Sequence, residues 1–350
     1  MDGYIPTKRK KKVKLEEIAE KAGVSRSTVS LVLRGSPLIS SSTTDKVRII
    51  AAQLGYVYNR AAASLRNRKS HVVGLIEANF KNPFFAAMSE TVERELDQKG
   101  KAILFTDSAE SLERQQKALR LMVEHGVDGI LLCPVKRTTA EDLSFLKEYG
   151  IPCVFFSRYI PGVDADFVGA ANFSGAFQAV KRFIELGHRR ILFVGGEPTT
   201  SPWFDRFGGF KKALEEGGGS TLEPLCMHSE VSLSGGARVA NTIIELNPLP
   251  TAILCYSDSV ALGVMLGLEK RGILPGRDIA IIGFDDLPVA KLWRPPLATL
   301  ACPPAQIGSW ATRVLLERME GHKGEGRKIE IPTVLLERAS LCSVPSGAKI

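Results

Sequence analysis

The segment Leu15–Gly35, "LEEIAEKAGVSRSTVSLVLRG", has the pattern of two short helices joined by a tight turn. The apolar residues of its first half recur at the spacing of one buried helix face, at Leu15, Ile18, Ala19 and Ala22. Gly23 ends this helix because glycine tolerates the left-handed conformation, and Ser25 stands where a second helix needs an N-cap. The pattern predicts a helix-turn-helix, completed by a third helix from residue 43 or 44 to about 54.

The outer side of the second helix has the composition of a surface that contacts bases. At 100° per residue, Val29, Val32 and Leu33 face the first helix, and Ser30, Leu31 and Arg34 point away from it. In a major groove, serine permits close approach, arginine can bond guanine twice, and leucine can touch a thymine methyl. A second interpretation has Leu31 packing on an N-terminal residue or a neighbouring subunit. The expected DNA contacts in this region are Ser25, Arg26, Ser27, Thr28, Ser30, Leu31 and Arg34.

The positive charge of the chain is concentrated at its start. Residues 1–70 hold 15 Lys and Arg against 5 Asp and Glu, while the remainder holds 31 against 33, for a formal net charge of +8 overall. This division predicts a basic module that meets a polyanion, joined to a near-neutral globular body. The run Lys8–Lys12, by itself, is typical of a solvated tail.

The cysteines exclude a zinc site of the usual spacing. All six lack a CxxC partner or a neighbouring histidine, so we expect free thiols in a reducing compartment and neither metal nor cofactor. The basic start is not followed by the apolar stretch of a signal peptide, and no run reaches about 18 apolar residues. We therefore expect a cytoplasmic protein without a membrane partner.

Several motifs in the correct order resemble the LacI/GalR family of bacterial transcription repressors. Besides Leu15–Gly35, they are "KVRIIAAQLGYVYNRAAASLRNRKSHVVGLI", "NPFFAAM", "YSDSVALGVMLGLEKRGI" and "GFDD", and the likeness runs from about Lys14 to about Ala339. The resemblance implies a cytoplasmic, nucleoid-associated homodimer, a repressor more often than an activator, whose two heads bind a near-palindromic double-stranded operator. A small-molecule effector, a sugar or sugar derivative, would control this binding.

The segment "NRAAASLR", residues 59–66, is expected to be a helix of about two turns, too short to be stable alone. By resemblance it is the hinge helix, which orders against its copy in a second subunit on DNA. Leu65 then takes the place of the leucine that wedges into the minor groove, and Asn59 and Arg66 also contact DNA. The other interpretation is a helical linker with one exposed leucine. Tyr58 replaces the proline usual before Asn59, and Leu31 stands where arginine or histidine is common, so the operator sequence is left open.

Short apolar runs alternate with helical patterns from His71 onward, which predicts parallel strands covered on both sides. The runs are "VVGLIEA", "AILFTD", "GILLCPV", "PCVFFS", "RRILFVGG", "AILCYSD", "IAIIGFDD" and "ATLAC". The fold class is therefore an all-α helix-turn-helix head plus an α/β body of two doubly wound parallel-sheet lobes, of the periplasmic-binding-protein-like type.

The expected division is a head at 1–58, a hinge and linker at 59–70, and a body at 71–345. The resemblance implies three crossings between the lobes, which we place near 162–164, 287–291 and 321–326. Lobe 1 then covers about 71–163 and 291–323, and lobe 2 about 164–290 and 324–345.

Ligands of open α/β sheets lie beyond the carboxyl ends of the strands, so the loops after these runs are the candidate effector site. Phe84, Arg206, Ser257 and Asp285 match family positions that contact effector. Aromatic rings beside charged hydrogen-bonding groups suit a sugar. Phe85 and Asp258 are better explained as a core aromatic and a helix N-cap. The expected effector contacts are Phe84, Ser157, Arg158, Trp203, Arg206, Ser257 and Asp285.

Two other classes of protein fit the sequence less well. A periplasmic-type solute-binding protein without a regulatory role would share the body, but it would lack the basic head and would carry an export signal. An enzyme would need a catalytic motif, and we find no GxGxxG after a strand, no P-loop, no GxSxG and no close histidine pair. We therefore expect no enzymatic activity. The identity of the effector, the sign of its effect and the choice between dimer and tetramer are left open.

Overall fold

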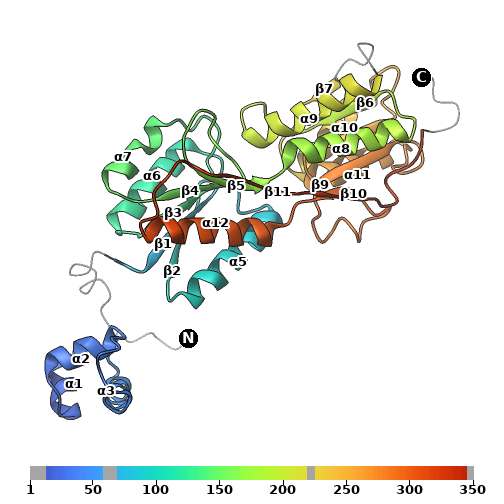
Figure 1. Ribbon diagram of the computed structural model, residues 1–350. Coiled ribbons are helices and arrows are strands. Elements are labelled where there is room, and N and C mark those ends of the chain that lie inside the picture. The colour runs from blue at the N-terminus through green and yellow to red at the C-terminus, as the bar shows by residue number, and fades with distance from the viewer. Residues whose placement is uncertain (1–12, 58–68, 219–224, 345–350) are drawn as a thin grey trace, which may run out of the picture. The chain divides into compact units, whose positions relative to one another are not determined.

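The computed structural model describes residues 13–57, 69–218 and 225–344 (Figure 1). The chain divides into two compact units, Met1–Ser70 and His71–Ile350.

The first unit is a three-helix bundle built from α1 (Leu15–Ala22), α2 (Arg26–Leu33) and α3 (Ser41–Gln53). Gly23 has a φ of 66° and ends α1, and the hydroxyl of Ser25 accepts a hydrogen bond from the Thr28 N–H at the start of α2, as predicted. The side chains of Ile18, Val29, Val32 and Val47 are at most 1% exposed. The third helix begins earlier than predicted because Ser40, rather than a residue nearer Thr43, caps it.

The second unit contains two six-stranded sheets. The first has the order β11-β5-β4-β3-β1-β2, with β1 (Val72–Glu77), β2 (Ala102–Asp107), β3 (Gly129–Leu132), β4 (Cys153–Phe156), β5 (Asp166–Ala170) and β11 (Lys328–Ile331). The second has the order β12-β10-β9-β8-β6-β7, with β6 (Ile191–Val194), β7 (Leu225–Met227), β8 (Ala252–Cys255), β9 (Ala280–Asp285), β10 (Ala298–Ala301) and β12 (Val334–Leu336). All paired strands are parallel except β10 and β12.

Helices cover both sheets, which confirms the predicted two-lobed α/β body (Figure 1). The first lobe has α5 (Pro83–Gln98), α6 (Leu112–Glu124), a 3₁₀ turn (Glu141–Leu143), α7 (Ser144–Glu148) and α12 (Pro304–Met319). The second has α8 (Asn172–Glu185), α9 (Ser201–Gly218), α10 (Leu233–Ile243) and α11 (Asp258–Glu269). Within these layers α5 packs on α12, α8 on α9, and α10 on α11. Gly236 allows the last contact, because a Cβ there would lie 2.2 Å from the Val260 carbonyl oxygen.

The three crossings between the lobes do not lie where the sequence predicts them. Strand β5 belongs to the first sheet and α8 to the second lobe, so the first crossing is at residues 170–172 rather than 162–164. The second falls between β10 and α12, at residues 301–304 rather than 287–291. The third joins β11 to β12, at residues 331–334 rather than 321–326.

The predicted lobe boundaries are therefore wrong. One reason is that β10 pairs with β9 and belongs to the second sheet. The other is that β5 and β11 escape recognition. Their sequences, "DFVGA" and "KIEI", contain charged residues or glycine and no unbroken apolar run. The two strands pair in parallel, Phe167 opposite Lys328, although some 160 residues separate them. This pairing moves both strands into the first lobe.

Candidate functional sites

The outer face of α2 and its N-cap is polar and internally bonded. The Ser25 Oγ accepts from the Thr28 N–H at 3.0 Å and lies 3.2 Å from the Ser27 Oγ. Arg34 donates through Nη2 to the Ser30 Oγ at 3.0 Å and through Nε to the Ser30 carbonyl oxygen at 3.1 Å. These contacts hold the polar groups in place on one surface of the helix.

Arg26 is paired with Glu16 of α1, with 3.0 Å between Nε and Oε1. Both side chains are more than half exposed, so the pair contributes little to stability and is inexpensive to break. A negatively charged partner can therefore displace Glu16 and form an ion pair with Arg26.

Leu31 is partly buried, yet it is absent from the hydrophobic residues that pack around the core of the described part of the head. Leu33, by contrast, packs against that core, as predicted. Leu31 therefore lies on the outer face with Ser27 and Arg34. Asn59, Leu65 and Arg66 lie outside the described residues.

A pocket lies between the two lobes of the body, beyond the carboxyl ends of several strands. It has a volume of about 70 Å³. Residues of both lobes line it: Asn79, Asn82, Phe84, Phe85, Glu110, Ser157, Arg158, Ala170, Asn172, Pro202, Arg206, Val231, Tyr256, Ser257, Asp285 and Ile307. Six of the seven predicted effector contacts are among them.

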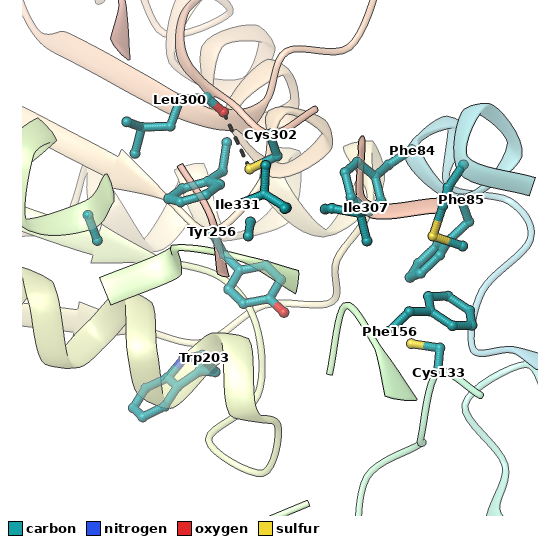
Figure 2. Packing of buried hydrophobic residues seen from close by; sticks show 14 of the residues in the cluster. Phe84, Phe85, Cys133, Phe156, Trp203, Tyr256, Leu300, Cys302, Ile307 and Ile331 are labelled. Carbon is teal, nitrogen blue, oxygen red and sulfur yellow. Dashed lines mark hydrogen bonds between the residues drawn. The ribbon is translucent and has the colours of Figure 1, made fainter. Parts of the chain in front are cut away.

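Trp203 is the predicted contact that the pocket does not include. Its ring stacks on Phe207 at 4.7 Å between centroids and meets Phe193 edge-on, inside the core of the second lobe. Figure 2 shows this ring set apart from Phe84, Phe85 and Phe156. The turn of α9 that carries Trp203 directs its neighbours Pro202 and Arg206 to the pocket instead.

Arg206 is held rigidly in the pocket wall. Its Nε donates to the Asn172 Oδ1 at 2.8 Å, and its Nη1 donates to the Tyr256 carbonyl oxygen. The guanidinium also lies over the rings of Phe284, at 3.7 Å, and Tyr256, at 4.7 Å. The Nη2 nitrogen lies 3.8 Å from the Asp285 Oδ1, too far for a hydrogen bond.

Asp285 is 8% exposed and has a φ of 114°, a conformation that is strained for a residue with a Cβ. Burial raises the pKa of its carboxyl to about 7, while nearby Arg206 lowers it. Near neutral pH this carboxyl can therefore either accept a hydrogen bond or donate one.

The first lobe contributes Ser157 and Arg158. Ser157 also has a positive φ, 58°, and its buried Oγ has no hydrogen-bond partner among the residues that the structure describes. Arg158 forms a two-bond ion pair with Glu110, at 2.7 and 2.8 Å. The charge of Arg158 is thus already balanced, whereas the Ser157 hydroxyl is available to a ligand.

Ser257 takes the N-cap role that the sequence suggests for Asp258. Ser257, not Asp258, is the N-cap of α11 and accepts from the Val260 N–H at 3.4 Å, although it also lines the pocket. Asp258 is fully buried and accepts hydrogen bonds from the Leu287 N–H at 2.7 Å and the Thr299 hydroxyl at 2.6 Å. The N-cap interpretation of Asp258 is therefore wrong, because this side chain turns inward and joins the loop after β9 to strand β10.

Phe84 and Phe85 are both buried, and both line the pocket. Phe85 meets Phe156 edge-on at 6.3 Å, so it is a core aromatic as predicted and a pocket residue as well (Figure 2).

Sequence reasoning missed Glu110, Asn172 and Tyr256. Asn172 follows β5, a strand that the sequence pattern does not predict. The strand-end rule therefore could not identify Asn172. Tyr256 directly precedes Ser257 after β8, where the same strand-end rule could have found it. Glu110 gives no local signal beyond its place in the loop after β2.

No helix in the part of the chain that the structure describes is long and apolar enough to cross a membrane. The same residues contain no cluster of three or more histidine, cysteine or carboxylate side chains placed to hold a metal ion.

Comparisons with known proteins match both units. Residues 14–59 match the family model of bacterial regulatory proteins of the lacI family, and residues 180–341 match a periplasmic binding protein-like domain. The crystal structure of the lac repressor dimer bound to operator and the anti-inducer ONPF has the same fold, with a TM-score of 0.85, 23% identity, and coverage of 95% of this chain and 100% of that chain.

Two curated relatives are similar over almost their whole length. The ribose operon repressor of Haemophilus influenzae is 29% identical over 332 residues, 94% of this chain and 99% of that protein. The HTH-type transcriptional repressor PurR of Erwinia tasmaniensis is 30% identical over 336 residues, 95% of this chain and 97% of that protein. The DNA-binding match at residues 14–59 disfavours a solute-binding protein without a regulatory role. Because its similarity to such repressors extends over almost the whole chain at up to 30% identity, the chain belongs to the LacI family of bacterial regulatory proteins.

Proposed function

We propose that this protein is a sequence-specific transcriptional repressor whose affinity for its operator is controlled by a sugar or sugar derivative bound between the lobes. The observation that carries this proposal is the presence, in one pocket, of polar groups from both lobes, among them the Ser157 hydroxyl, which has no hydrogen-bond partner in the described part of the chain. Ser157 comes from the first lobe, and Arg206 and Asp285 come from the second. A ligand that bonds all three must bring the lobes together, so its binding and the position of the lobes are linked.

A sugar suits this pocket because of the mixture of groups it offers. The aromatic side chains Phe84 and Tyr256 can cover C–H faces, and a hydroxyl beside Arg206 and Asp285 can accept from the first and donate to the second. The small volume favours a compact ligand. The relative named as a ribose operon repressor is in keeping with this class of effector.

We also propose a homodimer that binds a near-palindromic operator, since the similar lac repressor structure is a dimer bound to operator. The contacts would come from Ser25, Arg26, Ser27, Thr28, Ser30, Leu31 and Arg34 of each head, and from Asn59, Leu65 and Arg66. The protein would act in the bacterial cytoplasm and would have no catalytic role, because its relatives are transcriptional repressors.

The test is selection of fragments from the source genome by the full-length protein, followed by footprinting. We expect one or a few protected sites with two-fold symmetry. A thermal-shift screen of sugars, sugar acids, sugar phosphates and purines then identifies ligands that alter protection of the selected site. Equal affinity for every genomic fragment and for random duplex, with and without the ligands, would refute the proposal.

A further inference from the structure

Among the residues that the structure describes, three polar contacts join the lobes outside the pocket. The Tyr159 N–H, in the loop after β4, donates to the Ser201 Oγ at the start of α9 at 2.8 Å. The Tyr159 hydroxyl donates to the Asp205 Oδ1, also at 2.8 Å. The Lys136 Nζ, after β3, lies 2.8 Å from the Glu197 Oε2, after β6. Lys136 and Tyr159 belong to the first lobe, and their partners belong to the second.

These contacts alternate along the chain with residues of the pocket. In the first lobe Ser157 and Arg158 line the pocket, and the next residue, Tyr159, makes the cross-lobe bonds. In the second lobe Pro202 and Arg206 line the pocket and are each preceded by a cross-lobe partner, Ser201 or Asp205. Residues four apart lie on one side of a helix, so α9 presents two adjacent rows, one to the ligand space and one to Tyr159.

Tyr159 is well anchored in its own lobe. Its ring meets Phe167 of β5 edge-on at 5.1 Å, and the Lys328 amine lies 5.0 Å from its centroid. When the lobes separate, the Tyr159 side chain must therefore stay with the first lobe, and the hydrogen bonds of Tyr159 to Ser201 and Asp205 of α9 must break. The same movement would pull Ser157 and Arg158 away from Arg206.

We infer that Tyr159, with Ser201 and Asp205, forms a latch that holds the lobes closed, and that the ion pair of Lys136 with Glu197 assists it. We call these five residues the latch. They are positioning residues, since they do not line the pocket. The inference rests on the proposed effector function for its purpose, because the latch sets the balance between open and closed lobes that a ligand must shift.

The members of the latch should contribute unequally. Lys136 and Glu197 are 37% and 53% exposed, so water screens their attraction and its loss should change the equilibrium little. The bond of Tyr159 to a charged acceptor is partly buried, and its loss should raise the open population about tenfold.

The structure supplies a direct reporter of closure. The backbone N–H of Tyr159 is bonded across the lobes, whereas the N–H of Ser157, two residues earlier, is bonded to the Val168 carbonyl oxygen within the first lobe at 2.9 Å. Hydrogen exchange at residue 159 therefore measures opening of the lobes, and exchange at residue 157 measures unravelling of the loop. Neither measurement needs the effector or the operator, so a failed latch and a failed regulatory function give different results.

The experiment compares full-length Tyr159→Phe with the wild type by hydrogen exchange resolved to single amides. We expect exchange at residue 159 to accelerate about tenfold, with exchange at residue 157 unchanged. The matched control is Tyr149→Phe, the same substitution at a tyrosine that is 66% exposed, which should change neither rate. An unchanged rate at residue 159, or equal acceleration at both amides, would overturn the inference.

Two further sets of variants separate the latch from a general loss of packing. Asp205→Asn keeps an acceptor for Tyr159 and should remain nearer to the wild type than Asp205→Ala. Lys136→Glu should slightly accelerate exchange of the residue 159 amide. Adding Glu197→Lys reverses the ion pair and should return that exchange rate to the wild-type value. Reversal of Lys212 and Glu216, an ion pair of similar exposure within α9, should have no effect. Equal behaviour of Asp205→Asn and Asp205→Ala would contradict the role of the Tyr159 bond.

Discussion

Arg206 of α9 and Asp285 at the end of β9 face each other in the pocket across 3.8 Å, a gap longer than a hydrogen bond. Arg206 is fixed by Asn172, Tyr256 and Phe284, so it cannot turn to close the gap without losing those contacts. The separation is therefore built in, and a ligand hydroxyl that lies beside the pair can accept a hydrogen bond from Arg206 and donate one to Asp285. The pair combines a permanent charge with a carboxyl whose pKa burial raises to about 7.

Replacing Asp285 by alanine should abolish the response to effector while operator affinity in its absence changes little. The reason is that the variant removes a ligand contact in the body and leaves the head intact. The measurement is operator binding with and without the effector found by screening. Asp97→Ala, at an exposed position on α5, serves as control, and a full response by the Asp285 variant would place the effector elsewhere.

Glu77 should make the protein less stable as pH rises. Its side chain is fully buried, Oε1 accepts from the Ser89 hydroxyl, and burial raises its pKa from 4.5 to about 7. The folded state then binds a proton more tightly than the unfolded state. The contribution of this proton to the free energy of unfolding is fully present below pH 4.5. It is lost as pH rises through 7, and the free energy of unfolding falls by up to about 3 kcal/mol.

The Glu77→Gln variant removes this titration, so its free energy of unfolding should decline less between pH 5 and 8 than that of the wild type. Urea unfolding of the full chain at several pH values provides the measurement. Glu90→Gln, at an exposed position on the same helix as Ser89, should retain the wild-type slope. Parallel pH profiles for wild type and Glu77→Gln would show that Glu77 does not titrate in this range.

Leu65→Ala should weaken specific operator binding more than nonspecific binding. A leucine wedged between base pairs contributes only where the duplex is bent at the correct site, whereas nonspecific binding depends mainly on charge. Titrations against the selected operator and random duplex at several salt concentrations measure both. If both affinities fall by the same factor, Leu65 is not a wedge.

Deletion of residues 1–66 should leave a folded body that binds effector but not DNA. The basis is the division of the chain into two compact units at Ser70, together with the positive charge concentrated before it. Circular dichroism, thermal shift with the screened ligand and an operator titration test the three parts of this expectation. Operator binding by the fragment would contradict the assignment of DNA contact to the head.

Local features of the sequence predicted the head almost completely. Gly23 and Ser25 act through their own backbone and neighbouring N–H groups, so the turn between α1 and α2 depends on residues within a few positions. The same holds for most strands of the body, because a buried parallel strand needs a continuous apolar run. The strand-end rule, together with the family resemblance, indicated seven effector contacts, of which six line the pocket.

Tertiary structure alone decided which lobe each segment joins and which side chains meet. The pairing of β5 with β11 joins strands that are distant in sequence and locally undistinguished, and it moves the first and third crossings. The second crossing moves because β10 pairs with β9 and so belongs to the second lobe. Trp203 and Asp258 turned inward because a helix places neighbouring residues on different sides, and only the packing around α9 and α11 determines which side is buried. The contact of Tyr159 with Asp205 likewise exists only because two lobes close on each other, a condition that no local pattern of residues records.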